Sequence, residues 1–243
     1  MAFMKYANIY SNPRTRAFDS GLRDYMYLIY RNMGAALLVS ALTAFIIGSS
    51  PFLLSIFVAN PVSGLAVWIG SIVVMFSIVR PKPDSTIEEM RNKLLLYACL
   101  MGISLSTIFV VYARVSIVTT FLTTAITFGA MSLYGYSTHR DLTGMGSFLL
   151  MGIVGILFAS IINMFLRSSA LSYQISCFGV IIFTLYTAFD VQRFKSLYNN
   201  YAGAGEDVTN RLAIMGALQL YMDFINLFLY LLRFLGERNN RRD

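Results

Sequence analysis

The sequence predicts an all-α integral membrane protein with seven transmembrane helices. Hydrophobic residues make up 57% of the 243 residues and charged residues only 13%, whereas a soluble domain carries about 25% charged residues. Seven apolar stretches are each long enough to cross a hydrocarbon core of about 30 Å, which takes about 20 helical residues. Short polar or charged segments separate these stretches, so a single polytopic domain accounts for the whole length.

The seven expected spans follow one another without a second domain. They cover residues 33–58, 62–79, 94–113, 117–136, 147–166, 173–194 and 212–235. The only long connection is the polar stretch "RFKSLYNNYAGAGEDVTNR" before the last span. We therefore expect an N-terminal arm (1–30), a transmembrane domain (31–236) and a basic C-terminal tail (237–243).

The distribution of basic residues predicts the orientation of the chain. The net charge is +7, but the basic residues are scattered through short loops and ends, which favours a topological role over nucleic-acid binding. With the N-terminus inside, thirteen of the 19 Lys and Arg residues fall on the cytoplasmic side and six on the other side. We expect a cytoplasmic N-terminus. The basic C-terminal tail would then lie outside, and a re-entrant last segment, which would bring it inside, stays open.

Two acidic residues need an explanation. Ten of the twelve lie in arms, loops or the tail, and only Asp190 and Asp223 lie within expected spans. An intramembrane carboxylate costs about 2.5–3.5 kcal/mol and is a candidate functional group for that reason. The alternative is a neutral, hydrogen-bonded acid that ties two helices together. Arg193, three residues after Asp190, could also pair with it near the membrane surface.

The last span carries a polar stripe. Gln219, Asp223, Asn226 and Tyr230 are spaced by four, three and four residues, which places them on one helical face. Such a stripe on an otherwise apolar helix is typical of a helix that lines a polar path inside a bundle. His139 is the only histidine and lies in a loop, so the sequence offers no His/Cys cluster of the kind that binds zinc.

The depths of the two aspartates differ within the expected spans. Asp190 lies about four residues, or about 6 Å, from the cytoplasmic end of its span. Asp223 lies about eleven residues, or about 17 Å, from the same end of the last span. Either the last helix begins well inside the cytoplasm or a tilt brings the carboxylates together.

Several segments together resemble one family. They are "FDSGLRDYMYLIYRNMG", "YACLMGISLSTIF", "FGAMSLYGYSTHRDLTGMGSFLLMGIVGI", "TAFDVQRFKSLY" and "LYMDFINLFLYLLR". The chain is similar to the transmembrane Bax inhibitor motif (Bax inhibitor-1-like) family in its bacterial branch. The resemblance implies a central seventh helix surrounded by the other six, residence in the bacterial inner membrane and a calcium leak controlled by pH. It also implies that Asp190 and Asp223 form a sensing pair, which Arg80 of "SIVRPKP" latches in the closed state.

The chemistry of the two carboxylates agrees with this implied role. Two carboxylates in a low-dielectric site cannot both ionise cheaply, so they should share a proton. Deprotonated, Asp190 and Asp223 would offer hard oxygen ligands for a transient Ca²⁺ ion. Protons and Ca²⁺ would then compete for the same two carboxylates. We expect no resident cofactor, and we expect the lipid bilayer to surround the protein.

Two other classes of function are open. One aspartate on each of two consecutive spans is also the layout of intramembrane aspartyl proteases. Those enzymes carry a G-x-G-D signature, whereas Asp223 follows "LQLYM" and no proline comes after it. We therefore expect no enzyme. The second class is a non-conducting regulatory scaffold, and no motif in the sequence identifies or excludes it.

Overall fold

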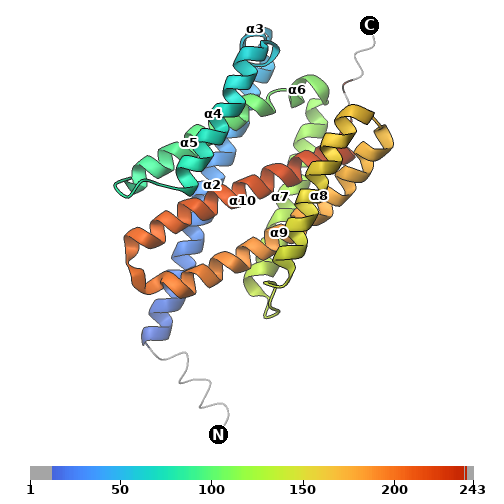
Figure 1. The fold of residues 1–243 in the computed structure, drawn as a ribbon. Helices are drawn as coiled ribbons and strands as arrows, with labels where there is room; N and C mark the ends of the chain where they lie inside the picture. Colours follow the sequence, from blue (N-terminus) through green and yellow to red (C-terminus); the bar gives the residue numbers. More distant parts are fainter. Residues whose placement is uncertain (1–12, 238, 240–243) are drawn as a thin grey trace.

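A computed structural model of the chain describes residues 13–237 and 239, and the regular elements of this part are helices (Figure 1). In order along the chain they are α2 (Pro13–Ser49), α3 (Pro51–Leu54), the π-helix η1 (Ser55–Ala59), α4 (Pro61–Val79), α5 (Ile87–Leu105), α6 (Ile108–Val111), α7 (Arg114–Ser137), α8 (Met145–Leu166), α9 (Ser169–Tyr201), the 3₁₀-helix η2 (Ala202–Ala204) and α10 (Glu206–Leu235). Seven of the helical segments are long and apolar enough to cross a membrane, with α5 and α6 counted as one. The predicted all-α class and the seven spans are confirmed.

Local chemistry explains where several helices begin. Pro61 opens α4 with its fixed φ angle, and the side chain of Asn60 accepts a hydrogen bond from the Val62 N–H at 3.0 Å. At the start of α5, the Thr86 hydroxyl accepts from the Glu89 N–H at 3.1 Å. These side chains satisfy N–H groups that have no partner within the helix.

Several helices begin earlier or end later than expected. Helix α2 already begins at Pro13, within the expected arm, and the polar connection before the last span is mostly helical, since α9 ends at Tyr201 and α10 begins at Glu206. Only η2 and Gly205, with φ of 98°, interrupt it. The extensions support each other, because the ring of Tyr25 on α2 packs on Tyr198 of α9 at 5.3 Å between centroids. Tertiary packing thus keeps a polar sequence helical, against the loop expected from its composition.

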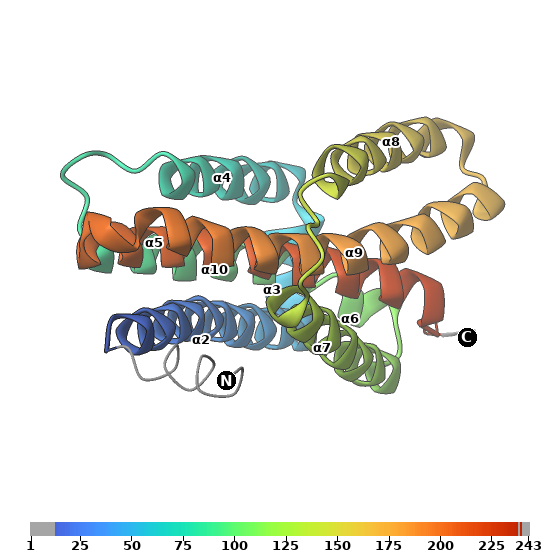
Figure 2. The ribbon, with the colours of Figure 1, turned by 90° about the horizontal axis from the view of Figure 1, so that it is seen from below.

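Helix α10 forms much of the protein core. Its neighbours are α2, α5, α7 and α9, while α4 packs on α5 and α8 packs on α9 (Figure 2). In its most apolar window 67% of the residues are buried, against 11% in α4 and in α8. The outer position of α4 and α8 follows from their nearly uniform apolar surface, which lipid can cover. That all six other helices surround α10 stays a prediction.

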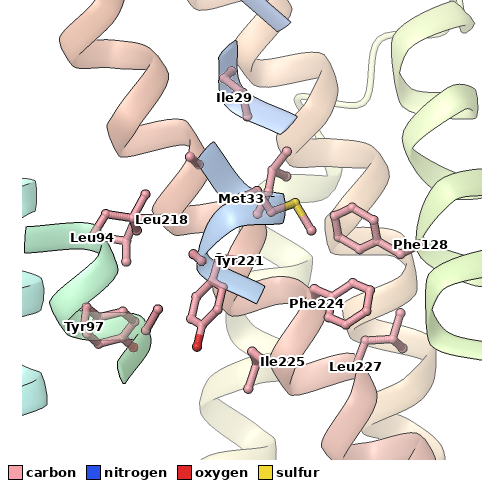
Figure 3. Packing of buried hydrophobic residues seen from close by; sticks show 14 of the residues in the cluster. Ile29, Met33, Leu94, Tyr97, Phe128, Leu218, Tyr221, Phe224, Ile225 and Leu227 are labelled. Carbon is pink, nitrogen blue, oxygen red and sulfur yellow. The ribbon is translucent and has the colours of Figure 1, made fainter. Parts of the chain in front are cut away.

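Aromatic side chains join the core around α10 (Figure 3). Tyr221 packs edge-on against Tyr97 of α5 at 5.8 Å, and its hydroxyl lies 2.7 Å from the hydroxyl of Ser40 on α2. On the opposite flank, Phe224 packs against Phe128 of α7 at 5.5 Å. The Tyr221–Ser40 hydrogen bond provides a partner for a hydroxyl that would otherwise be costly to bury.

The two ends of the described chain lie at opposite ends of the bundle (Figure 1). Beyond α10, the backbone pairs with the α6–α7 connection through Ala113 N–H to Glu237 O at 3.0 Å and Asn239 N–H to Val111 O at 2.9 Å. The end of α10 therefore lies beside the α6–α7 connection, as expected of a seventh crossing, and the side of the membrane on which the C-terminal tail lies stays a prediction. Residues 1–12 of the expected arm, and residues 238 and 240–243 of the expected tail, lie outside the described residues.

A close approach between α2 and α5 generates a first prediction. A Cβ atom on Gly102 would lie 2.7 Å from both the Ser40 carbonyl oxygen and the Thr43 Cβ. We expect Gly102→Ala to lower the free energy of unfolding by about 1–3 kcal/mol through overpacking, although alanine is the better helix former. Thermal unfolding in detergent measures the effect. Gly155→Ala is the matched control, because its Cβ would meet nothing within 4 Å; equal melting of the two variants would contradict the prediction.

The orientation in the membrane can be tested with reporter fusions. Lys93, which precedes the expected third span, lies within α5, so suitable fusion points on this side are Asp84, between α4 and α5, and Gly203, within η2. A reporter that is active only in the cytoplasm should work at both points and fail after Asn60, since the count of basic residues places the N-terminus inside. Fusion at the C-terminus should also be inactive. The reverse pattern would invert the proposed topology.

Candidate functional site

Asp190 and Asp223 meet inside the bundle. Asp190 lies on α9 and Asp223 on α10, and these helices form the most extensive pair in the protein. Asp190 is fully buried and Asp223 is 1% exposed. The two carboxyl groups are close enough to interact with each other, and the Gln219 side chain lies beside both. The structure thus brings together the two acids that the sequence singled out.

Few partners compensate the negative charge of the Asp190–Asp223 pair. Both oxygens of Asp190 and Oδ2 of Asp223 are buried and meet no partner with hydrogen-bonding geometry in the described part of the chain. The nearest cation is Arg193, whose Nη1 lies 3.7 Å from Asp190 Oδ1 and whose side chain is 55% exposed. Two buried carboxylates beside one half-exposed cation cannot both stay ionised at low cost. A shared proton or a bound cation would relieve this repulsion.

Helix α9 is closely packed at this level. Ala188 packs directly on Gly135 of α7, and Val191 is fully buried. The Thr187 hydroxyl donates within the helix, to the Phe183 carbonyl at 2.8 Å. The carboxylate of Asp190 therefore lies on a buried, closely packed part of α9.

The difference in depth has a simple geometric origin. Helix α9 continues for eleven residues beyond Asp190, about 16 Å, and α10 begins seventeen residues before Asp223, about 26 Å. The offset of several residues therefore persists, but both aspartates are buried and meet. Helices α9 and α10 are both longer at their shared end than the expected spans. The two aspartates meet although they lie at different distances from that end.

Arg80 lies elsewhere. It is the C-cap residue of α4, where its backbone N–H donates to the Phe76 carbonyl, and its side chain is exposed. Helix α4 packs on α5 rather than on α9 or α10. Among the side chains described from residue 20 to residue 237, none forms an ion pair with Arg80, and the cation beside Asp190 is Arg193. A latch formed by Arg80 stays a prediction and would need a different arrangement of α4.

The polar stripe of α10 divides into two parts. Gln219 lies at the carboxylate pair. Asn226 instead donates to the Met222 carbonyl of its own helix at 2.9 Å. Tyr230 stacks on Phe183 at 5.5 Å and occupies the space left by Gly179 on α9. The common face is as predicted, whereas a role of these three residues in lining a path stays a prediction.

Tyr186 is a site residue that sequence reasoning left undeveloped. It is half-buried on α9 and interacts electrostatically with Asp190 and Asp223. The signal in the sequence was its position four residues before Asp190, which places both side chains on one helical face. Its hydroxyl adds a polar group beside the pair.

The pair offers a cation only part of a ligand shell. Ca²⁺ takes about six to eight oxygen ligands, and Asp190 and Asp223 would provide only part of that shell. Among the described residues, no group of three or more His, Cys, Asp and Glu side chains gathers in the way that a resident metal site needs. Transient binding of Ca²⁺ by the two aspartates stays a prediction.

Comparisons with known proteins identify relatives over nearly the whole chain. The family described as "Inhibitor of apoptosis-promoting Bax1" matches residues 22–240. The inner membrane protein YbhL of Escherichia coli is 40% identical over 221 residues, which cover 90% of this chain and 94% of that protein. An uncharacterised protein of Rickettsia prowazekii is 41% identical over 234 residues, or 96% of each chain. An uncharacterised membrane protein of Streptococcus pyogenes is 34% identical over 227 residues, or 91% of this chain and 96% of that one.

The matched range extends from the first buried turn of α2 to the residues after α10 and includes both aspartates. Together with the seven membrane-spanning helices, it assigns the protein. The chain belongs to the Bax inhibitor-like family of multi-pass membrane proteins.

Proposed function

We propose that this protein is a pH-sensitive calcium leak channel of a bacterial inner membrane, with its N-terminus in the cytoplasm. The observation that carries the proposal is the buried Asp190–Asp223 pair, which no buried cation neutralises. Buried charges are normally paired or bind metal ions. An uncompensated pair inside a membrane bundle therefore fits a place where a cation or a proton binds and leaves.

The same pair explains sensitivity to pH. When the carboxylates share a proton, their charge and their mutual repulsion fall, and their affinity for a divalent cation falls with them. When the proton leaves, the pair becomes an anionic ligand and also attracts any nearby arginine. Binding or loss of a proton therefore changes the contact between the carboxylate pair and the neighbouring arginine. In this proposal, that contact is the gate.

The identity of that neighbour divides the mechanism into two versions. In the first, Arg193 holds the deprotonated Asp190 across the 3.7 Å ion pair. In the second, Arg80 reaches the pair after α4 has moved toward α9 and α10. The first version needs no rearrangement, because Arg193 already lies beside Asp190, and the geometry favours it for that reason. The two versions differ in which arginine, when removed, opens the path.

The first functional prediction concerns Asp223. We expect Asp223→Asn to lower calcium flux by about tenfold or more, the equivalent of about 1.4 kcal/mol, because the amide keeps the shape but removes the anionic oxygen. Purified protein in calcium-loaded liposomes measures the flux. Asp207→Asn is the matched control, since Asp207 lies on the same helix but is exposed and pairs with Arg211.

The outcomes of this experiment separate the three classes of function. Undiminished flux in well-folded Asp223→Asn would show that the ion passes elsewhere. Cleavage of an added membrane peptide by the wild type, lost in the variant, would indicate a protease. No flux and no cleavage in the wild type would leave a regulatory scaffold.

The second functional prediction concerns gating. Acidification should open the path, because protonation of the pair weakens its contact with the cation. Arg193→Ala should therefore leak at neutral pH, where the wild type is tight, and Arg193→Ala combined with Asp190→Asn should leak little more than either single variant, since both act on one contact. Liposome flux against pH measures all three. A leak caused by Arg80→Ala but not by Arg193→Ala would reverse the assignment.

A further inference from the structure

An apolar groove runs along one side of the bundle between α2 and α7. Both helices pack on α10 but hardly approach each other. Two adjoining cavities, of about 600 and 230 Å³, lie in the gap between these helices, and Leu37 and Phe224 line both of them. Figure 3 shows Met33 of α2 and Phe128 of α7 on the same side of α10, close to Phe224. We call this feature, which begins at Arg23 and continues past Leu37, the α2–α7 groove.

The polarity of the groove changes along its length. The larger cavity has Arg23 and Tyr136 at one end, the Tyr30 side chain about halfway along α2, and Leu37 and Phe224 at its inner end. A second cation is present at the polar end, because Lys195 donates to the Tyr136 carbonyl at 3.1 Å and lies 5.2 Å above the Tyr136 ring. The groove is therefore amphiphilic, with positive charge at the end of the bundle and hydrocarbon toward its middle.

Two further observations point to a polar ligand at that end. Arg23 forms no ion pair with the side chains described from residue 20 to residue 237, and the neighbouring Asp24 lines a different cavity, beside Tyr198. The Ser132 hydroxyl is buried in the groove wall without a partner of hydrogen-bonding geometry, close to the Tyr30 hydroxyl. Buried hydroxyls normally have partners, so Ser132 is ready to donate to an acceptor in the groove.

The dimensions match one leaflet of a bilayer. Arg23 and Leu37 are fourteen residues apart on α2, or about 21 Å along the helix. Half of a hydrocarbon core is about 15 Å thick, and the headgroup region lies beyond it. A lipid with its phosphate at Arg23 would thus place the end of its tail near Leu37 and Phe224.

The groove is unfilled by protein and open to the bilayer. A Cβ atom on Gly34 or on Gly129, which both line the larger cavity, would meet nothing within 4 Å. The flanking Leu38 and Leu133 are 66% and 71% exposed, as expected of lipid-facing side chains. An empty apolar groove would lose dispersion contacts along its whole wall, and within a membrane the available hydrocarbon is an acyl chain.

We propose that the α2–α7 groove binds one membrane phospholipid. Its acyl tail lies between α2 and α7 against Phe224, its ester oxygens accept from the Ser132 and Tyr30 hydroxyls, and its phosphate pairs with Arg23. The tail covers the side of α10 that α2 and α7 leave open, one residue from Asp223. The bound lipid thus completes the apolar wall around α10.

Native mass spectrometry of the purified full chain in mild detergent, titrated with phosphatidylglycerol, tests the proposal. The wild type should retain one lipid. The double variant Gly34→Leu/Gly129→Leu fills the groove and should bind about tenfold more weakly or worse, since no room remains for the tail. Gly155→Leu is the matched control, because that glycine also faces open space but lies on α8. It should bind like the wild type.

The headgroup is tested separately. Arg23→Gln should weaken binding of phosphatidylglycerol by about threefold or more, as expected for loss of one charged contact, and leave binding of diacylglycerol, which has no phosphate, unchanged. Inorganic phosphate alone should not displace the lipid; displacement would indicate a site for a free anion instead.

Equal retention of phosphatidylglycerol by the groove-filled double variant and the wild type would overturn the proposal. Circular dichroism and a single elution peak check that each variant is folded. If the double variant does not fold, Gly34→Leu and Gly129→Leu alone carry the same test. Retention unchanged in both single variants would overturn the proposal equally.

Discussion

The burial of two carboxylates side by side is the constraint on which the rest of the structure depends. Asp190 and Asp223 are removed from water at the contact between α9 and α10, and the half-exposed Arg193 is the cation beside them among the described side chains. Such a pair is costly in a low-dielectric interior, so the surrounding packing must hold the two helices together against this repulsion. The long α9–α10 contact, the approach of α7 at Ala188 and the aromatic core around α10 provide that packing. Close packing of three helices thus surrounds the two buried carboxylates.

Close packing against neighbouring helices distinguishes α10 from the outer helices. Helices α4 and α8 expose most of their apolar surface, which lipid covers without further cost, whereas α10 buries its apolar faces against protein. With lipid as solvent, the hydrophobic effect does not select inner helices, and close packing and interhelical hydrogen bonds do. Gly102 lets α5 approach α2, Gly179 makes room for Tyr230, and Ser40 satisfies the Tyr221 hydroxyl. Small and polar residues therefore decide which helix lies inside.

The surroundings of α10 are unequal on its different sides. Helices α5 and α9 close two of them with protein, while the gap between α2 and α7 leaves a third open to hydrocarbon. Phe224 forms the floor of that gap and directly follows Asp223 in the chain. The composition of the membrane and the state of the carboxylate pair would then act on adjacent residues of one helix.

The sequence by itself determined the number and order of the membrane-spanning helices and the two acids at the site. A span needs a long apolar run and tolerates few charges, so both features are visible one segment at a time. Only the tertiary structure decided the helix ends between α9 and α10, because the packing of Tyr25 on Tyr198 keeps a polar stretch helical. It also placed Arg193 rather than Arg80 beside Asp190, and it left α2 and α7 apart. These features depend on how helices distant in the sequence lie against each other, and the periodicity of a single helix carries no information about its neighbours.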